Sequence, residues 1–366
     1  MSKKKMKKPL TKKQKRRKRR RIILICELIA LIILSVLVYL YSKFGKIDFN
    51  DLGNIQTNQL DDKTKELLSG YTTIALYGVD SRDMDSYKNS NSDSMIICVI
   101  DNDKKEIRLM SVLRDTYMDV DGEGTYRKCN YAYAKGGPKE SMEMLNRNLD
   151  LDIQEYVSVN WKALADAIDA VGGVEADVSA EEAAALVDPE YFVQKNTEDF
   201  IGRKGGRVKA GKQTLNGVQA VAYCRIRHGA GDDYSRTDRQ REVLSQLITK
   251  VKGSGISKIN KLIDAIFPEV STSLSLSQVI GLATNISDYK LGESKGFPFD
   301  RRSTTIAGAG SIVVPCTLKS NVVDAYQFLY NKEDYEPSDT VNSISKRIIN
   351  KTGFTETDSV TYKSNK

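Results

Sequence analysis

Histidine is almost absent from this sequence of 366 residues, in which His228 is the only one. This scarcity argues strongly against a histidine-rich zinc site. It leaves His228 as the only histidine available to a catalytic triad, although a surface histidine is the simpler interpretation. Cysteine is also scarce, and no two cysteines form a C-x-x-C pair. Because Cys26 lies in an apolar run, the other four can form two disulfides at most, so the chain is not a disulfide-rich scaffold.

Acidic residues are missing from the first 21 positions, which hold 14 of the 56 Lys and Arg residues. The rest of the chain has 42 bases against 48 acids, a balance of −6, although the whole chain has a formal charge of +8. The basic character therefore belongs to an N-terminal tail. A nucleic-acid-binding surface across the folded body is not supported, and no nucleic acid is expected as a partner. Internal repeats are absent as well.

Residues 22–41 form a long apolar run, IILICELIALIILSVLVYLY, interrupted by the single acid Glu27. A helix of 20 residues is about 30 Å long, which matches the hydrocarbon core of a membrane. The basic tail before it marks the cytoplasmic side and suits anionic membrane lipid. The sequence therefore predicts a cytoplasmic tail (1–21), one transmembrane helix (22–41) and an extracytoplasmic remainder, held in the cell membrane.

A cleaved signal peptide is the alternative interpretation of this run. Such a peptide has a shorter apolar region, followed by a cleavage site of small residues. The residues that follow here, SKFGKIDF, do not resemble such a site. A retained signal-anchor is therefore favoured.

The part beyond the span divides into a polar stalk (42–70), one folded domain (71–335) and a polar tail (336–366) that is expected to be loosely ordered. Within the domain, strand-like apolar runs alternate with segments of helical spacing. This alternation predicts an α/β or α+β fold, in which helices flank a central mixed β-sheet in three layers. The segment 195–212, rich in Gly, Lys and Arg, is expected to be an exposed loop.

The predicted strands and helices follow from the period of the apolar residues. Strands are expected at residues 72–79, 94–100, 106–113 and 311–314, with a turn rich in Asp and Asn joining the second to the third as a hairpin. Helices are expected at residues 61–68, 138–149, 161–171, 181–186, 214–223, 237–251, 276–286 and 321–330. Pro138 suits the first turn of its helix, and Gly172-Gly173 suits the end of another.

Two acids lie where predicted strands meet their loops. Asp80 follows the strand 72–79, and Asp93 directly precedes the strand 94–100. Ligands of open α/β sheets bind at such strand ends. Two carboxylates from neighbouring strands can supply oxygen ligands to one Mg²⁺, with Mn²⁺ as an alternative, while water and phosphate oxygens complete the coordination. The other interpretation is that both aspartates cap turns.

Arginines gather in two further clusters. Arg114 ends an apolar strand, so it either points into a polar cleft or pairs with Asp115. If residues 224–228 are extended, Arg225 and Arg227 face the same way. On the helix that follows, three residues share one face and can bind phosphate: Arg236, Arg239 and Gln240. A solvated, salt-bridged surface is the alternative, but an Arg-x-Arg beside apolar elements fits it less well.

Taken in order, these motifs resemble the LytR–CpsA–Psr family. The resemblance runs from about residue 71 to residue 251, roughly half the chain. It rests on GVDSR (78–82), SDS (92–94), SVLRDTY (111–117), KCNYAYAKGG (128–137), AIDAVGGVEADV (167–178), QTLNGVQAVAYCRIRH (213–228) and DDYSRTDRQREVL (232–244). The resemblance implies a cell-envelope phosphotransferase of a Gram-positive-type envelope. Such enzymes move teichoic acid, capsular polysaccharide or related glycopolymers from an undecaprenyl-pyrophosphate carrier onto peptidoglycan.

The resemblance also implies roles for single residues. Asp80 and Asp93 match the magnesium-binding acids of the family. A second set matches positions that hold the pyrophosphate: Arg82, Arg114, Lys128, Arg225, Arg227, Arg236 and Gln240. SVLRD replaces the commoner proline-containing form of its motif. The acid before the last motif is doubled, as Asp232-Asp233, which leaves open which of the two is the family's.

A mechanism follows from these charges as a hypothesis. Mg²⁺ on Asp80 and Asp93 bridges the pyrophosphate oxygens, and three arginines neutralise the charge of the transition state: Arg114, Arg225 and Arg227. A sugar hydroxyl of peptidoglycan attacks the phosphorus that bears the glycopolymer, and polyprenyl phosphate leaves. Asp233 is the candidate for positioning or deprotonating that hydroxyl. The polyprenyl tail needs an apolar tunnel, for which ordinary core residues are the alternative interpretation: Val157, Leu164, Ile168, Leu186, Phe192, Leu244 and Ile248.

Other functions compete with transfer. The same site could hydrolyse a pyrophosphate lipid, with water in place of the sugar. A membrane-associated transcriptional regulator or attenuator is disfavoured by the predicted topology and by the acidic body. A non-catalytic glycan or lipid anchor would not need the two aspartates. Cys129 and Cys224 each adjoin a candidate ligand, and they form either a disulfide or two free thiols.

Overall fold

The computed structural model of the protein describes residues 42, 45, 47–80, 92–227, 233–254 and 256–360. The contacts divide the chain into residues 1–46 and 47–366, and every strand and helix discussed below belongs to the second unit. Within the described part of the chain, no helix is both long enough and apolar enough to cross a membrane. The predicted basic tail (1–21) and transmembrane helix (22–41) lie outside the described residues and stay predictions.

A mixed seven-stranded sheet forms the centre of the fold, in the order β1-β10-β7-β2-β3-β4-β11. Its strands are β1 (Asp48–Phe49), β2 (Tyr71–Val79), β3 (Ser92–Asp101), β4 (Glu106–Val112), β7 (Glu155–Asn160), β10 (Val270–Thr272) and β11 (Lys290–Phe297). β2 and β4 are both antiparallel to β3 between them, while β7 is parallel to β2 and β11 is parallel to β4. The predicted α/β fold with a central mixed sheet is confirmed, as is the hairpin of β3 and β4.

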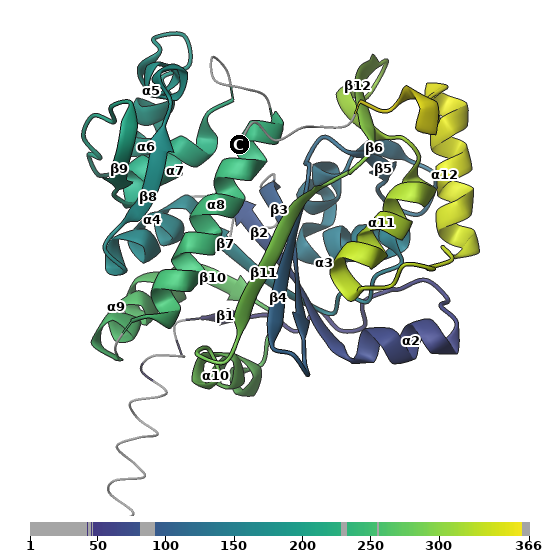
Figure 1. The fold of residues 1–366 in the computed structure, drawn as a ribbon, viewed down its shortest axis with the longest axis horizontal. Helices are drawn as coiled ribbons and strands as arrows, with labels where there is room; N and C mark the ends of the chain where they lie inside the picture. Colours follow the sequence, from purple (N-terminus) through teal and green to yellow (C-terminus); the bar gives the residue numbers. More distant parts are fainter. Residues whose placement is uncertain are drawn as a thin grey trace, which may run out of the picture. The chain divides into compact units, whose positions relative to one another are not determined.

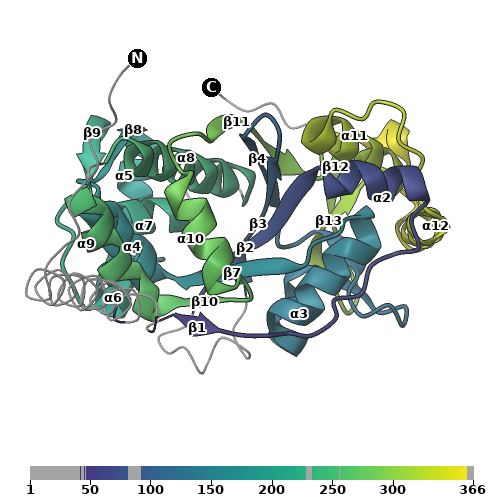
Figure 2. The same ribbon diagram turned by 90° about the horizontal axis from the view of Figure 1, so that it is seen from below.

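Successive side chains of a strand point to opposite faces of the sheet, and both faces of this sheet are buried. In β2, Ala75, Tyr77 and Val79 belong to one apolar cluster, whereas Ile74 belongs to another. Figures 1 and 2 show α3 (Asn130–Leu149), α11 (Leu318–Tyr330) and α12 (Asp339–Thr352) on one side of the sheet. On the other side lie α4 (Trp161–Ala170), α7 (Gly217–Arg225), α8 (Asp233–Lys252) and α9 (Ile256–Ile266).

The C-terminal segment differs from the loosely ordered tail that the sequence predicted. Residues of α12 are buried in the main core cluster, among them Val341, Ile344 and Ile348. The mean hydropathy of this helix is low because its other face is polar, so the segment as a whole looks like a tail. Apolar residues on one helical stripe are enough to hold it on the domain. The prediction of a loosely ordered, polar C-terminal tail is therefore wrong for residues 339–352.

Residues 47–70 are packed against the domain rather than separate from it. Ile47 and Ile55 are buried, β1 pairs in parallel with β10, and α2 (Asp62–Ser69) forms where a helix was expected. Asp61 caps α2 by accepting hydrogen bonds from the backbone N–H groups of Lys63 and Thr64. The described part of the predicted stalk is thus ordered structure.

Smaller elements complete the unit. Three two-stranded sheets are formed by β5 (Tyr117–Asp119) with β6 (Tyr126–Lys128), β8 (Val174–Val178) with β9 (Gly211–Leu215), and β12 (Arg301–Ile306) with β13 (Gly310–Pro315). The remaining helices are α5 (Ala180–Val187), α6 (Val193–Ile201) and α10 (Leu276–Thr284). The exposed loop predicted for 195–212 is wrong at both ends, where α6 and β9 lie. The capping box of Ser179 and Glu182 fixes the start of α5.

α4 and α7 pack closely because the contact contains a glycine. A Cβ atom built on Gly217 would lie 2.0 Å from the carbonyl oxygen of Ala165, so no other residue fits. The N–H of Gly217 donates to the Asp169 carboxylate at 2.7 Å, which anchors the start of α7 to α4. This close contact brings the C-terminal residue of α7, Arg225, to the first residue of α4, Trp161.

Candidate functional site

Three parallel strands end at one edge of the sheet, and candidate site residues follow each of them. β2, β4 and β7 run in the same direction. Asp80 comes directly after β2, Arg114 comes two residues after β4, and Trp161 comes directly after β7. The carboxyl ends of parallel strands form the usual ligand-binding edge of an α/β sheet. The topology therefore gathers these residues at one place.

Asp93 reaches this edge from the opposite direction, at an irregularity in β3. Gly78 pairs with Ser94 and Val79 with Ser92, so Asp93 is an extra residue between the two pairs. Such a β-bulge re-aims a side chain, and here Asp93 lines a cavity beside the sheet. Its Oδ1 accepts a hydrogen bond from Nη1 of Arg114 at 2.5 Å. Gly78 permits the close approach of the two strands, because a Cβ there would lie 3.1 Å from Cβ of Ser94.

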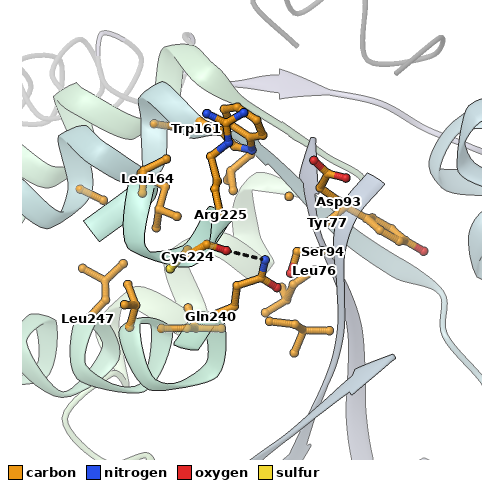
Figure 3. Close-up of a pocket in the computed structure, with 18 of the residues that line it drawn as sticks. Leu76, Tyr77, Asp93, Ser94, Trp161, Leu164, Cys224, Arg225, Gln240 and Leu247 are labelled. Atoms are coloured by element: carbon orange, nitrogen blue, oxygen red, sulfur yellow. Dashed lines mark hydrogen bonds between the residues drawn. The ribbon is translucent and has the colours of Figure 1, made fainter. Parts of the chain in front are cut away.

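The cavity has a volume of about 310 Å³ and lies between the sheet and α4, α7 and α8 (Figure 3). Its wall is mostly apolar and is made by Leu76, Ile96, Val157, Val159, Leu164, Val221, Val243, Leu244, Leu247 and Ile266. Its charged lining consists of Asp93, Arg225, Arg227 and Arg236. The cavity therefore suits an amphiphilic molecule with a long apolar part and an anionic group.

Arg225 is held from two sides. Its guanidinium carbon lies 3.5 Å from the centre of the Trp161 ring, and its Nη1 donates to Oγ1 of Thr197 in α6 at 2.6 Å. Burial lowers the pKa of Arg225 to about 10, while the negative charges of Asp80 and Asp93 oppose this shift. Both aspartates therefore lie within electrostatic range of the same guanidinium.

Two residues of α8, one charged and one polar, complete the polar side of the cavity. Arg236 is 3% exposed, and Gln240 lies one turn further along, where its Nε2 donates to the carbonyl of Cys224 at 3.3 Å (Figure 3). The neighbouring Arg239 is turned toward the protein. It pairs with Glu182 of α5 at 3.0 Å and donates to the carbonyl of Ile226 at 2.7 Å, and so it holds the segment that carries Arg227.

The extended conformation considered for residues 224–228 is not found at Cys224 and Arg225, which lie in α7. Arg225 is the last residue of helix α7 and is not part of an extended strand. Arg225 and Arg227 nevertheless line the same cavity, since the chain turns out of the helix at Ile226. Arg114 does not pair with Asp115 as one interpretation had it. Asp115 instead binds Lys128 at 3.0 Å, and Lys128 is not among the residues that line the cavity.

Some predicted residues cannot be placed. Arg82, His228 and Asp232 lie outside the described residues. Asp233 begins α8, but the description of this residue does not extend to its side chain. Their roles stay predictions. Asp80, Asp93, Arg114, Arg225, Arg227, Arg236 and Gln240 are the predicted residues that the fold brings to one edge of the sheet.

A comparison with protein families identifies this arrangement. The model of the LytR_cpsA_psr family matches residues 34–315. The chain belongs to the LytR–CpsA–Psr family. The match ends at the end of β13, so α11 and α12 lie beyond it although they belong to the main core.

Individual LytR–CpsA–Psr proteins agree with this assignment. The chain is 30% identical over 213 residues to the polyisoprenyl-teichoic acid–peptidoglycan teichoic acid transferase TagU of Enterococcus faecalis, covering 58% of this chain and 64% of that protein. It is 32% identical over 199 residues to the transferase of the same description, TagV, of Bacillus subtilis, covering 53% and 48%. The match therefore spans about half to two thirds of these relatives. The solved structure of gbs0355 from Streptococcus agalactiae has the same fold, with a TM-score of 0.60 and 24% identity, covering 77% of this chain and 93% of that one.

The apolar wall of this LytR–CpsA–Psr chain was predicted in part. Of the seven tunnel candidates, Val157, Leu164 and Leu244 line the cavity. The other four do not: Ile168 and Leu186 are buried in a separate core cluster, Ile248 packs against the apolar cluster on one face of the sheet, and Phe192 is 46% exposed. Periodicity marks a residue as apolar and inward-facing, but it does not distinguish a cavity wall from a filled core.

Two contributors to the site were missed. Trp161 and Thr197 contact Arg225, and neither was predicted to belong to the site. Trp161 carried a usable signal, since it is the only tryptophan of the chain and directly follows a strand that ends at the ligand-binding edge. Thr197 carried none, because α6 itself was not predicted.

The cysteines beside the candidate ligands are free. Cys129 and Cys224 are both buried and are not linked, so the disulfide interpretation is wrong. Burial raises the pKa of the Cys224 thiol to about 12 and also raises that of Cys129, which makes both unreactive near neutral pH.

Asp80 and Asp93 have the donor chemistry of a partial site for a divalent cation. The described residues contain no group of three or more acidic, histidine or cysteine side chains that could hold a metal ion alone. Mg²⁺ in phosphate-binding enzymes takes one or two carboxylates and completes its shell with water and substrate oxygens. Asp80 and Asp93 act on the same guanidinium, and Asp93 lines the cavity, so they are suited to that smaller contribution.

Proposed function

We propose that this protein is a phosphotransferase that moves a glycopolymer of the teichoic acid or capsule type from an undecaprenyl-pyrophosphate carrier onto peptidoglycan. The observation that carries the proposal is the cavity, in which an apolar wall of about ten side chains ends at three arginines and an aspartate. A polyprenyl diphosphate has the matching two parts, an apolar tail and a group of concentrated negative charge. The names of the relatives TagU and TagV support the same substrate class.

The charged end of the cavity has the chemistry that a diphosphate needs. Guanidinium groups bind phosphate oxygens with two parallel hydrogen bonds, and they do so more strongly where water is excluded. Arg225, Arg227 and Arg236 supply this charge from α7, the segment after it, and α8. Arg114 and Arg82 are proposed to add to it, and Lys128 to act from the periphery through Asp115. Fixed positive groups stabilise the charge that develops on the phosphoryl oxygens during transfer.

A magnesium ion is proposed to be bound by Asp80 and Asp93, with Mn²⁺ as a substitute. When bound, it would supply a Lewis acid for the phosphoryl oxygens. The residues of the chain do the rest. The arginines orient the diphosphate, and Gln240 holds the last turn of α7, which carries Arg225. Asp233 is proposed to accept the proton of the attacking sugar hydroxyl as polyprenyl phosphate leaves.

The setting of the reaction is part of the proposal. The apolar run 22–41 and the basic tail before it support a single-pass protein of the cell membrane, with the domain on the outer side. Both the lipid carrier and peptidoglycan would be within reach there, and anionic membrane lipid would bind the tail.

The test uses the full-length protein in lipid vesicles with a polyprenyl-diphosphate glycan, peptidoglycan and Mg²⁺. Covalent attachment of glycan to peptidoglycan is expected. It should be lost with EDTA, and it should fall by about 10²-fold or more in Arg227→Ala. Arg108→Ala is the matched control, since Arg108 is held by Glu106 and Asn331 and does not line the cavity.

Other results would change the assignment. Release of free glycan phosphate without attachment would make the protein a pyrophosphate-lipid hydrolase. Loss in Arg227→Ala without any effect of EDTA would remove the metal from the proposal. Specific DNA binding, with no reaction on lipid, would favour a regulator instead.

A further inference from the structure

We propose that Trp161 and Thr197 form a rigid seat for Arg225, and that this seat sets the position in which Arg225 meets the diphosphate. The two are positioning residues, because they act through Arg225. The inference rests on the proposed function for its chemistry, although the seat itself consists of contacts that the structure contains.

The stacking contact fixes the plane of the guanidinium. Its carbon lies 3.5 Å from the centre of the Trp161 ring, and Trp161 is only 7% exposed. A desolvated cation on the face of an indole is held more firmly than an exposed one. The indole is itself supported by packing, since the ring centre of Phe200 lies 4.9 Å away. Trp161 is thus itself fixed in the core.

The hydrogen bond to Thr197 fixes the rotation of the guanidinium within that plane. The Oγ1 of Thr197 donates its single proton to the carbonyl of Val193 at 2.8 Å. It therefore meets Arg225 as an acceptor, at 2.6 Å from Nη1. Thr197 is fully buried, so no water competes for this bond. A plane and one in-plane direction together define a single orientation of the group.

This geometry leaves the group suited to bind an anion. Stacking uses the face of the guanidinium, whereas its N–H groups point outward in its plane, where phosphate oxygens bind. A free arginine side chain loses rotamer entropy when it is ordered. In this protein the seat has ordered Arg225 before the ligand arrives, which is the condition for strong electrostatic catalysis. The seat is therefore expected to act on the rate more than on substrate binding.

The arrangement also joins two regions of the fold to the site. Trp161 begins α4 directly after β7, whereas Thr197 lies in α6, within a segment predicted to be an exposed loop. A shift of α6 would therefore move Arg225. This makes α6 a determinant of the site although none of its residues lines the cavity.

The test compares the full-length variants Trp161→Leu, Thr197→Val and Thr197→Ser. We expect the kcat of transfer to fall by about tenfold in Trp161→Leu and in Thr197→Val, with a smaller change in KM. Thr197→Ser keeps the hydroxyl and should restore the rate. Phe328→Leu is the packing control: it removes a buried aromatic ring from the main core but does not line the cavity, and its rate should stay close to that of the wild type.

A double-mutant cycle separates positioning from general stability. In an Arg225→Lys background there is no planar group to seat, so Trp161→Leu should have little further effect. An equal loss in both backgrounds would overturn the proposal, as would a wild-type rate in Thr197→Val.

A binding measurement keeps this test independent of the proposed function. Trp161 is the only tryptophan of the chain, so its fluorescence reports directly on the seat. Farnesyl diphosphate is expected to change this emission, and farnesol, which lacks the phosphates, is expected to change it much less. If no transfer is detected but this difference is present and is reduced in Thr197→Val, the seat stands and the transferase function falls. Equal responses to the two probes would overturn the seat as a diphosphate-binding device.

Discussion

Arg114 and Asp93 form an ion pair at the edge of the sheet, with Nη1 and Oδ1 2.5 Å apart. The pair joins the end of β4 to the bulge at the start of β3, and both side chains are largely buried. It has a consequence for the proposed metal site, because the carboxylate that would bind the cation is also bound by an arginine that would bind the diphosphate. Substrate and metal are then expected to bind together, each releasing one partner of this pair.

Arg114→Gln tests this coupling. Without the guanidinium, Asp93 is available to a cation, so the affinity for Mn²⁺ in the absence of substrate should rise. Transfer should nevertheless fall by about 10²-fold or more, since a positive charge that binds the diphosphate is lost. Mn²⁺ titration followed by electron paramagnetic resonance measures the first effect. Arg108→Gln is the control on the same strand, and weaker Mn²⁺ binding in Arg114→Gln would contradict the coupling.

The lowered pKa of Arg225 predicts how binding depends on pH. Burial lowers this pKa to about 10, and the diphosphate binds the charged form. Affinity for farnesyl diphosphate, followed by Trp161 fluorescence without metal, should therefore be constant below pH 10 for this group and should fall as the pH rises above it. The Arg225→Gln variant should lack this step. A step of unchanged size in that variant would show that another titrating group causes the fall in affinity.

The buried pair of Arg239 and Glu182 predicts a loss of stability. Both side chains are mostly buried, 3.0 Å apart, and Glu182 also closes the capping box of α5. Glu182→Gln removes a negative charge that is hydrogen-bonded to a buried guanidinium and should reduce the free energy of unfolding by about 1.5–3 kcal/mol. Urea unfolding of residues 47–366 measures this. Asp334→Asn breaks an exposed pair with Lys332 and should leave the midpoint unchanged; equal shifts in both variants would refute the argument.

Asp150 predicts a second loss of stability, because its carboxylate ties the N-terminal and C-terminal segments together. It is fully buried and accepts hydrogen bonds from Asn58, from the hydroxyl of Tyr335, and from both the N–H and the hydroxyl of Ser338, at 2.6–2.9 Å. Its backbone is left-handed, with φ of 54°, a conformation that asparagine also tolerates. Asp150→Asn therefore changes the charge and the acceptors alone.

This variant should lower the free energy of unfolding by about 2–4 kcal/mol, since charge-assisted hydrogen bonds are lost and an amide donor meets other donors. The measurement is again urea unfolding of residues 47–366. The exposed Asp152 provides the matched control, as Asp152→Asn should have no measurable effect. An Asp150→Asn protein as stable as the wild type would show that the network contributes little.

The helix α12 predicts the outcome of a truncation. Removing residues 337–366 exposes the surface covered by Val341, Ile344 and Ile348, and each of these side chains contributes about 1.5–3 kcal/mol when buried. The shortened protein should unfold at much lower urea concentration or fail to fold. Lys346→Ala changes an exposed residue of the same helix and should have little effect. A truncated protein of normal stability would support the loosely ordered tail that the sequence predicted.

Local patterns in the sequence were sufficient for much of the fold. The strands β2, β3 and β4 and the helices α4, α8, α10 and α11 agree with their predicted segments within a few residues, because each has an uninterrupted apolar period or a clear cap. α6, β11 and α12 were missed, since their residues are mixed in character. Their contacts with distant parts of the chain, such as those of α12 with the main core, decide their structure.

The sequence by itself determined most of the charged residues that gather at one edge of the sheet, because acids and arginines placed at strand ends and in spaced motifs can be read from their order. Only the tertiary structure decided how they meet. The bulge at Asp93, the close contact of α4 and α7 at Gly217, and the seat of Arg225 on Trp161 and Thr197 all join residues far apart in the chain. Such contacts depend on packing between elements, and that packing has no period or motif in the sequence.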